Sequence, residues 1–242
     1  MRVALIAIGL SALGGFGGLS VAAVLCLFPD GVRRRVVPAL VSYAVGALLG
    51  VALLDLVPEA SVVLGTRRAL ATTMVGIVMF FALEKLALWR HGQAGVAEYR
   101  PTAQLVLVGD SAHNFMDGAL IGAAELVSVP LAVSTAIAVL AHEIPHELGD
   151  FAILLNAGYS RTRALVLNGL SESAGLVGAF AAVVCLRQLP MLAPHFLAFA
   201  SASFVYVAMA DLIPEMHRGS THIAAPWQVT LVATGVLTVA VL

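Results

Sequence analysis

Residues 130–157 read PLAVSTAIAVLAHEIPHELGDFAILLNA, a stretch long enough to cross a lipid bilayer as one helix. Its apolar run is interrupted by HEIPHELGD at 142–150, which carries two histidines and three carboxylates. A charged side chain inside a spanning helix costs about 2.5–3.5 kcal/mol on insertion scales and usually marks a functional pathway. A polar cluster in the middle of an apolar span is therefore the feature that the rest of the sequence has to explain.

The composition of the whole chain indicates an integral membrane protein. Of its 242 residues 60% are hydrophobic and only 11% are charged, and the mean hydropathy is +0.98. Soluble domains carry about 25% charged residues. The net charge of −1 gives no reason to expect a nucleic-acid partner, and the two cysteines lack C-x-x-C spacing. We therefore expect the lipid bilayer to be the main surrounding of this chain.

Eight segments are long and apolar enough to span a membrane, which predicts an all-α polytopic membrane protein with one transmembrane domain over 1–242. Charged residues, prolines and glycines separate them. Because only a few residues join the fourth segment to the fifth, these two helices should be antiparallel neighbours. The expected helices lie near 2–28, 36–59, 68–89, 102–125, 130–157, 162–187, 192–215 and 222–242.

The basic residues predict the orientation of these helices, because cytoplasmic connections carry an excess of Lys and Arg. Nine basic residues lie at or beside odd-numbered connections: Arg33, Arg34, Arg35, Lys85, Arg90, Arg100, Arg161, Arg163 and Arg218. Four lie on the other side: Arg2, Arg67, Arg68 and Arg187. We therefore expect both termini to be extracytoplasmic in a multi-pass protein of the plasma membrane, here a bacterial inner membrane.

A five-residue motif occurs twice, as DLVPE at 55–59 and DLIPE at 211–215. The two copies end the second and the seventh expected helix, which run in opposite directions. An inverted-topology repeat would place them in this way, and such repeats are typical of secondary transporters. The alternative is a chance recurrence, because proline and acidic residues are common at helix ends.

Two neighbouring expected helices carry side chains that bind divalent metal ions. Residues four apart share a helix face, as in the pairs His113/Asp117 and His142/His146. No Lys or Arg lies deep enough to neutralise the acids, so the excess of negative charge implies a cation. Imidazole with carboxylate favours Zn²⁺ or another first-row divalent ion. The candidate ligands are His113, Asn114, Asp117, His142, Glu143, His146 and Glu147.

Further polar residues are candidates for the route of the ion or for proton transfer. Glu172 in the sixth expected helix is either a ligand, a partner of a ligand, or part of a proton path. Pro145 predicts a kink, and a kinked helix at membrane depth is tolerated where it lines protein or a water-filled cavity. The other candidates for the ion route or a relay are Asp55, Asp110, Asp150, Asp211, His217 and His222.

The two motifs resemble those of a known family. HNFMDG at 113–118 and HEIPHELGD at 142–150 resemble the signatures of the fourth and fifth helices of the ZIP (Zrt/Irt-like) metal transporters. The resemblance implies a 3+2+3 arrangement, in which two inverted three-helix repeats flank helices four and five. It also implies ATP-independent carriage of Zn²⁺, and often of Fe²⁺, Mn²⁺ or Cd²⁺, toward the cytoplasm by a homodimer.

By the same resemblance, a central and often binuclear metal site is expected between helices four and five. The main site would consist of His113, Asp117, His142 and His146. The neighbouring site would consist of Asn114, Glu143 and Glu172, with Glu147 as a further member of the motif. Relatives with Glu at the position of His142 resemble broader Mn²⁺/Zn²⁺ carriers, so this histidine favours zinc.

Two other functions fit parts of the sequence. The H-E-x-x-H pattern from His142 to His146 is typical of zinc proteases, in which Glu143 would be the general base and Asp117 a third ligand. Such proteases have the two motifs in the opposite order, and Pro145 distorts the helix between the histidines. A metal sensor is the third hypothesis, for which the sequence contains no soluble output domain. We therefore expect a transporter of divalent metal ions rather than an enzyme.

Overall fold

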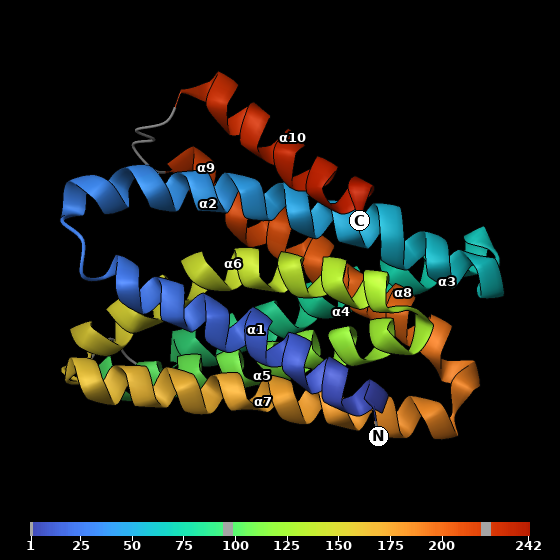
Figure 1. Cartoon of the computed structure of the whole chain (residues 1–242). Helices are drawn as coiled ribbons and strands as arrows, with labels where there is room; N and C mark the ends of the chain where they lie inside the picture. The colour runs from blue at the N-terminus through green and yellow to red at the C-terminus, as the bar shows by residue number, and fades with distance from the viewer. Residues whose placement is uncertain (1, 94–98, 219–223) are drawn as a thin grey trace.

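The structure of the chain, a computed structural model, describes residues 2–93, 99–218 and 224–242 (Figure 1). Every regular element in these ranges is helical, so the predicted all-α class is confirmed. The helices lie roughly side by side in a bundle, with α6 between α1 and α2 in the view of Figure 1. His222 lies outside the described residues.

Two of the helical stretches contain a π-helical turn, and the others are α-helices apart from one short 3-10 turn. The elements are α1 (Arg2–Leu25), α2 (Asp30–Gly50), η1 (Val51–Leu56), α3 (Val57–Leu64), α4 (Thr66–Gln93), α5 (Tyr99–Val127), α6 (Val129–Asn156), α7 (Arg161–Gln188), η2 (Pro190–Leu192), α8 (Ala193–Tyr206), η3 (Val207–Leu212), α9 (Ile213–Arg218) and α10 (Ala225–Val241). The stretches α2–η1–α3 and α8–η3–α9 are each continuous.

These helices overlap all eight expected segments but differ at several ends. The second stretch begins at Asp30 rather than near residue 36, because Pro29 precedes it in an extended conformation and an acidic residue is favourable in the first helical turn. Within the described residues, six stretches are long and apolar enough to span a membrane: Arg2–Leu25, Asp30–Leu64, Thr66–Leu86, Val129–Asn156, Arg161–Gln188 and Pro190–Leu212. The polar α5 and the shorter α10 complete the bundle.

The connection between α5 and α6 is a single residue, Ser128. Its side-chain oxygen accepts a hydrogen bond from the amide of Leu131 at 3.3 Å and so caps α6. Pro130 occupies the first turn of α6, where its missing amide hydrogen leaves no intrahelical bond unmade. The expected antiparallel pairing of these two helices is confirmed.

The contacts between helices follow the symmetry of an inverted repeat. Each contact made by one of the first three spans has a counterpart made by one of the last three. α1 packs against α6 and α7 against α5, while α2 packs against α10 and α8 against α4. α1 and α7 also contact each other. A 3+2+3 inverted repeat around α5 and α6 predicts these corresponding contacts.

Both copies of the five-residue motif begin inside a π-helical turn. Asp55 lies in η1 and Asp211 in η3, and each is followed three residues later by a proline. The amides of Val57 and Ile213 donate to carbonyls five residues earlier. A proline lacks the amide hydrogen and its ring displaces the carbonyl four residues earlier, so wider spacing in this turn relieves the clash. The repeat thus extends from the sequence to the backbone conformation.

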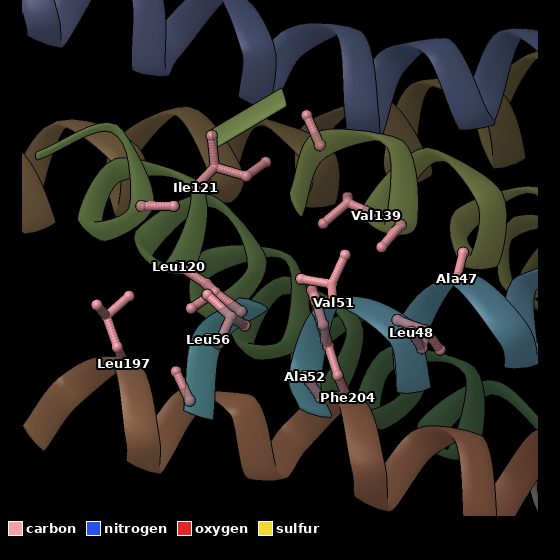
Figure 2. Packing of buried hydrophobic residues seen from close by; sticks show 14 of the residues in the cluster. Ala47, Leu48, Val51, Ala52, Leu56, Leu120, Ile121, Val139, Leu197 and Phe204 are labelled. Atoms are coloured by element: carbon pink, nitrogen blue, oxygen red, sulfur yellow. The ribbon is translucent and has the colours of Figure 1, made fainter. Parts of the chain in front are cut away.

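Apolar side chains of α2, η1, α5, α6 and α8 meet in the centre of the bundle. Figure 2 shows this cluster, which includes Leu48, Val51, Leu56, Leu120, Ile121, Val139, Leu197 and Phe204. Because lipid is as apolar as these side chains, helices in a membrane associate mainly through close packing at small residues. Gly178 of α7 is such a residue: a Cβ there would lie 2.0 Å from the carbonyl oxygen of Phe115 on α5.

We expect Gly178→Ala to destabilise the protein by about 1–3 kcal/mol, the usual cost of an overpacked contact, because the added carbon meets backbone that cannot rotate away. Thermal unfolding in detergent, followed by tryptophan fluorescence, measures the effect. Gly169→Ala is the matched control, since it lies on the same helix and its Cβ would meet no atom closer than 3.7 Å. Equal melting temperatures for the two variants would contradict the α5–α7 contact.

Candidate metal centre

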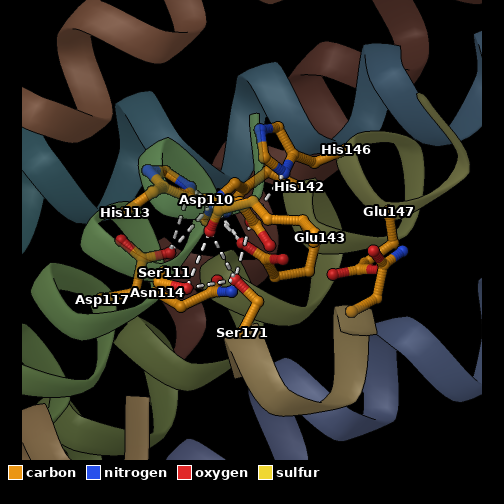
Figure 3. A network of polar contacts seen from close by, with 12 residues as sticks. Asp110, Ser111, His113, Asn114, Asp117, His142, Glu143, His146, Glu147 and Ser171 are labelled. Carbon is orange, nitrogen blue, oxygen red and sulfur yellow. Dashed lines mark hydrogen bonds and ion pairs between the residues drawn. The ribbon is translucent and has the colours of Figure 1, made fainter. Parts of the chain in front are cut away.

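α5 and α6 place the candidate ligands in facing rows. Because the helices are antiparallel, the N-terminal half of α5 faces the C-terminal half of α6. Asp110 therefore lies beside His146, with 3.5 Å between Oδ1 and Nδ1, and Asp117 beside His142, with 3.0 Å between Oδ2 and Nε2 (Figure 3). The ligands thus lie at two levels of the bundle, which are four residues apart on α6 and seven residues apart on α5.

Four of these side chains form what we name the central group: His113, Asp117, His142 and Glu143. His142 Nε2 lies 3.1 Å from His113 Nε2 and 3.2 Å from Glu143 Oε1. His113 Nε2 lies 3.6 Å from Asp117 Oδ2 and 3.4 Å from Glu143 Oε1. Ligand atoms of a tetrahedral zinc ion, with bonds of about 2.0–2.1 Å, are about 3.3–3.4 Å apart. The central group therefore has the dimensions of a four-coordinate metal site.

Hydrogen bonding orients the lone pairs of the central group toward one another. His142 Nδ1 lies 2.9 Å from the carbonyl oxygen of Ala138, to which it donates, and this leaves the lone pair on Nε2. The buried carboxylate oxygens of Asp117 and Glu143 have no hydrogen-bond donor. In the described part of the chain, the Arg–carboxylate ion pair joins Arg33 to Asp30, away from this group. The imidazole and carboxylate lone pairs of the central group therefore point toward one another without a hydrogen-bond donor, and a cation among them would stabilise this arrangement.

A second cluster, named the acidic group, consists of Glu143, Glu147 and Glu172. Glu147 Oε2 accepts a hydrogen bond from Asn168 Nδ2 of α7 at 2.7 Å. Glu172 points at α1, where a Cβ on Gly15 would lie 1.9 Å from Glu172 Oε2, so the glycine leaves room for the carboxylate. Because Glu143 belongs to both groups, its side chain joins the acidic group to the central group.

A third cluster, named the cavity group, consists of Asp110, His146 and Asp150. It lines a cavity of about 460 Å³, together with His113 and His142 of the central group. Asp211 of η3 also lines this cavity. The central group and the cavity group thus follow one another along α5 and α6, and the cavity reaches both of them, whereas the acidic group lies between α6 and α7.

The ZIP zinc transporter family matches residues 90–242, which is more than half of the chain and includes every ligand of the three groups. The chain belongs to the ZIP zinc transporter family. This result confirms the family that the two sequence motifs indicated. Together with its apolar helices, it makes the chain a multi-pass membrane protein of this family.

Similar proteins carry names of metal transporters. Zinc transporter ZIP10 of Danio rerio is 40% identical over 128 residues, which are 53% of this chain and 15% of the relative. Zinc transporter ZIP6 of Homo sapiens is 38% identical over 136 residues, 55% of this chain and 18% of the relative. Zinc transporter ZIP13 of Pongo abelii is 33% identical over 216 residues, 82% of this chain and 64% of the relative. The chain thus spans less than a fifth of the first two.

The structure of this ZIP protein divides the ligands of the expected main site between two groups. His113, Asp117 and His142 lie together in the central group, where Glu143 joins them. The ring of His146 lies next to that of His113, with 5.1 Å between the ring centroids, and its Nδ1 lies 3.5 Å from Oδ1 of Asp110. His146 lies beside Asp110 because α5 and α6 are antiparallel. One turn after His142 on α6 therefore faces one turn before His113 on α5.

The expected neighbouring site is also rearranged. Glu143 and Glu172 lie together as expected, and Glu147 is the third member of their group. Asn114, expected as a ligand beside them, is buried and donates from Nδ2 to Asp110 Oδ1 at 3.2 Å. The amide therefore orients a carboxylate of the cavity group.

The candidate route residues lie in different places. Asp110 and Asp150 belong to the cavity group and Asp211 lines the cavity, whereas Asp55 lies half-buried beside Ser134 of α6, outside all three groups. His217 is exposed in α9.

Asn168 on α7 is fully buried and donates a hydrogen bond to Glu147, and it was not among the candidate residues predicted from the sequence. The sequence does contain an indication of its role, because a polar residue four positions before Glu172 lies on the same helix face as Glu172. Ser171, next to Glu172, was missed as well: its hydroxyl lies 2.8 Å from that of Ser111 on α5. Both residues tie α7 to the ligand-bearing helices.

We expect His142→Ala to weaken Zn²⁺ binding at least about 100-fold, because even outer-shell partners of a metal are typically worth about 10–100-fold. Competition with a zinc chelator in detergent gives the dissociation constant. His195→Ala is the control, because this histidine is exposed at the start of α8. Unchanged zinc affinity in a folded His142→Ala protein would show that the central group does not hold the ion.

Proposed function

We propose that this ZIP family member carries a divalent transition-metal ion, with Zn²⁺ as its main substrate, across the membrane without ATP. The central group supports the proposal most directly, because two imidazoles and two carboxylates converge with spacings of 3.0–3.6 Å. Fe²⁺, Mn²⁺ and Cd²⁺ accept the same donor types and are the further candidate substrates.

The arrangement fits an ion that passes through better than an ion that stays. A structural zinc site is usually closed by four dedicated ligands. Here Glu143 is common to the central and acidic groups, and the cavity reaches the central and cavity groups. An ion that moves between the central and the acidic group can therefore keep Glu143 as a ligand throughout. This property supports passage through the protein.

We further propose that the cavity faces the cytoplasm, so that transport is uptake. The cavity residues lie toward the C-terminal half of α6, and a separate groove at that end of the bundle is lined by Arg33, Arg34 and Arg161. Cytoplasmic connections are rich in such residues. The termini would then be extracytoplasmic, in the plasma membrane, and specifically the inner membrane of a bacterium.

The assembly that we propose is a homodimer, as the resemblance to the family implies. The protease hypothesis is not supported, since the family and the similar proteins are transporters. The position of Glu143 also argues against it. Its buried carboxylate lies among the candidate ligand atoms, 3.2 Å from His142 Nε2.

The proposal predicts Zn²⁺ entry into zinc-free liposomes that contain the purified protein, measured with a fluorescent zinc indicator inside the vesicles. His142→Ala and His146→Ala should each remove most of the Zn²⁺ flux, because each removes one candidate ligand atom of α6. His195→Ala should transport like the natural protein. Absence of Zn²⁺ movement at every pH and voltage tested would refute the proposed function, and full uptake by both ligand variants would refute the proposed site.

A further inference from the structure

A groove with a volume of about 560 Å³ lies at the end of the bundle where α1 and α6 end and where α2 and α7 begin (Figure 1). It shares no lining residue with the cavity beside the metal ligands. Its lining residues also differ from those of the central, acidic and cavity groups. The groove is therefore a separate feature, which the proposed transport of metal ions does not use.

The outer end of the groove is basic. Arg33 and Arg34 near the start of α2 and Arg161 at the start of α7 line it. Of the lining residues Asp30 is acidic, and it pairs with Arg33. Arg34 and Arg161 are exposed, and among the described residues they form no ion pair with a carboxylate. Three arginines and one aspartate leave a net charge of +2, so the groove favours an anionic ligand.

The rest of the groove is apolar and extends along the helices toward the middle of the bundle. On α2, Val37 and Pro38 follow the arginines by about one turn. On α6, the lining residues Leu155, Phe151 and Leu148 cover two turns, a length of about 10 Å. An inorganic anion gains nothing from such a lining, whereas a hydrocarbon chain does. Positive charge at one end and an apolar slot behind it match an anionic amphiphile.

Exposed apolar side chains indicate that this end of the bundle lies at the surface of the bilayer. Leu27 is 76% and Phe28 47% exposed in the connection between α1 and α2, directly after the groove residue Cys26. Such side chains are stabilised by contact with lipid and not with water. Basic pockets between membrane-spanning helices bind anionic headgroups. The groove thus opens where such headgroups are available.

We propose that this groove binds an anionic phospholipid of the surrounding bilayer. The headgroup phosphate lies beside Arg34 and Arg161, and part of an acyl chain lies over Phe151 and Leu155. Arg33 stays paired with Asp30. The lipid then contacts α2, α6 and α7 at once. This site does not depend on the proposed transport function.

Native mass spectrometry of the delipidated protein in a neutral detergent, titrated with dioleoyl phosphatidylglycerol, tests the proposal. One molecule should bind per chain, and zwitterionic dioleoyl phosphatidylcholine should bind at least about tenfold more weakly. Arg34→Gln/Arg161→Gln should weaken the affinity for phosphatidylglycerol about 30-fold, because each basic residue near an anionic lipid contributes about 1 kcal/mol. Arg67→Gln/Arg68→Gln is the matched control, since it removes two exposed charges at the opposite end of the bundle.

A second variant separates a lipid from a soluble anion. Ala152 is exposed and lines the groove, so Ala152→Trp should fill the apolar slot and weaken phosphatidylglycerol binding while both arginines remain. Ile153→Trp is the control, because the next residue is 39% exposed and does not line the groove. Glycerol 3-phosphate, which carries the phosphate without acyl chains, should not compete. Thermal melting followed by circular dichroism reports that each variant is folded.

The outcomes decide between a lipid site, a soluble-anion site and no site. Equal affinity for the two phospholipids, or unchanged affinity for phosphatidylglycerol in Arg34→Gln/Arg161→Gln, would overturn the proposal. Competition by glycerol 3-phosphate, together with full binding to Ala152→Trp, would show a site for soluble anions and would overturn it as well. Weakened binding confined to the groove variants would support the lipid site, whether or not the protein moves Zn²⁺.

Discussion

Buried carboxylates that no Lys or Arg of the described residues neutralises are the constraint on which the rest of this structure depends. Asp117, Glu143 and Glu172 reach the interior from α5, α6 and α7. Desolvation of such charges costs several kcal/mol each unless a counter-charge and hydrogen bonds compensate it. Small residues let the three helices approach closely enough for one cation to contact several carboxylates at once. The tight α5–α7 packing at Gly178 is thus a requirement of the electrostatics as well as of membrane packing.

The close approach of α1 serves the same constraint. A Cβ on Gly15 would overlap the carboxylate of Glu172, and a Cβ on Gly18 would lie 2.6 Å from Cβ of Glu143. The backbone of α1 therefore lies directly against the acidic group and separates it from lipid. In a soluble protein water could solvate these acids. At membrane depth they are tolerated only where protein shields them from lipid.

Much of this architecture could be predicted from the sequence, because each signal was local. Hydropathy indicated the helices, and the spacing of His113, Asp117 and His142 placed these residues on facing surfaces of two neighbours. The division of the ligands could not be predicted in the same way. Whether His146 lies with His142 or with Asp110 depends on the vertical register of α5 against α6, which is set by packing and by the one-residue connection at Ser128. The four-residue spacing places Asn168 on the same face of α7 as Glu172, but its bond to Glu147 depends on the rotation of α7 against α6, which that spacing does not give.

The π-helical turns show a different limit of sequence reasoning. The paired D-L-x-P-E motifs indicated a repeat, but the wider turn at Asp55 and Asp211 follows from how each proline is accommodated. The two aspartates have different surroundings, since Asp211 lines the cavity and Asp55 lies beside Ser134. The two motif copies of the repeat are therefore in unequal environments.

The shared carboxylate of Glu143 has a consequence for ions that follow one another. A cation bound in one group withdraws negative charge from that carboxylate, so the same carboxylate attracts a second cation in the other group less strongly. Two cations at this spacing also repel each other, and the repulsion is large where water is scarce. If each group holds a cation, their occupancy is therefore anticooperative, and the arrival of a second ion loosens the first. Tight binding and rapid release, which conflict in a single isolated site, become compatible in a pair that shares one ligand.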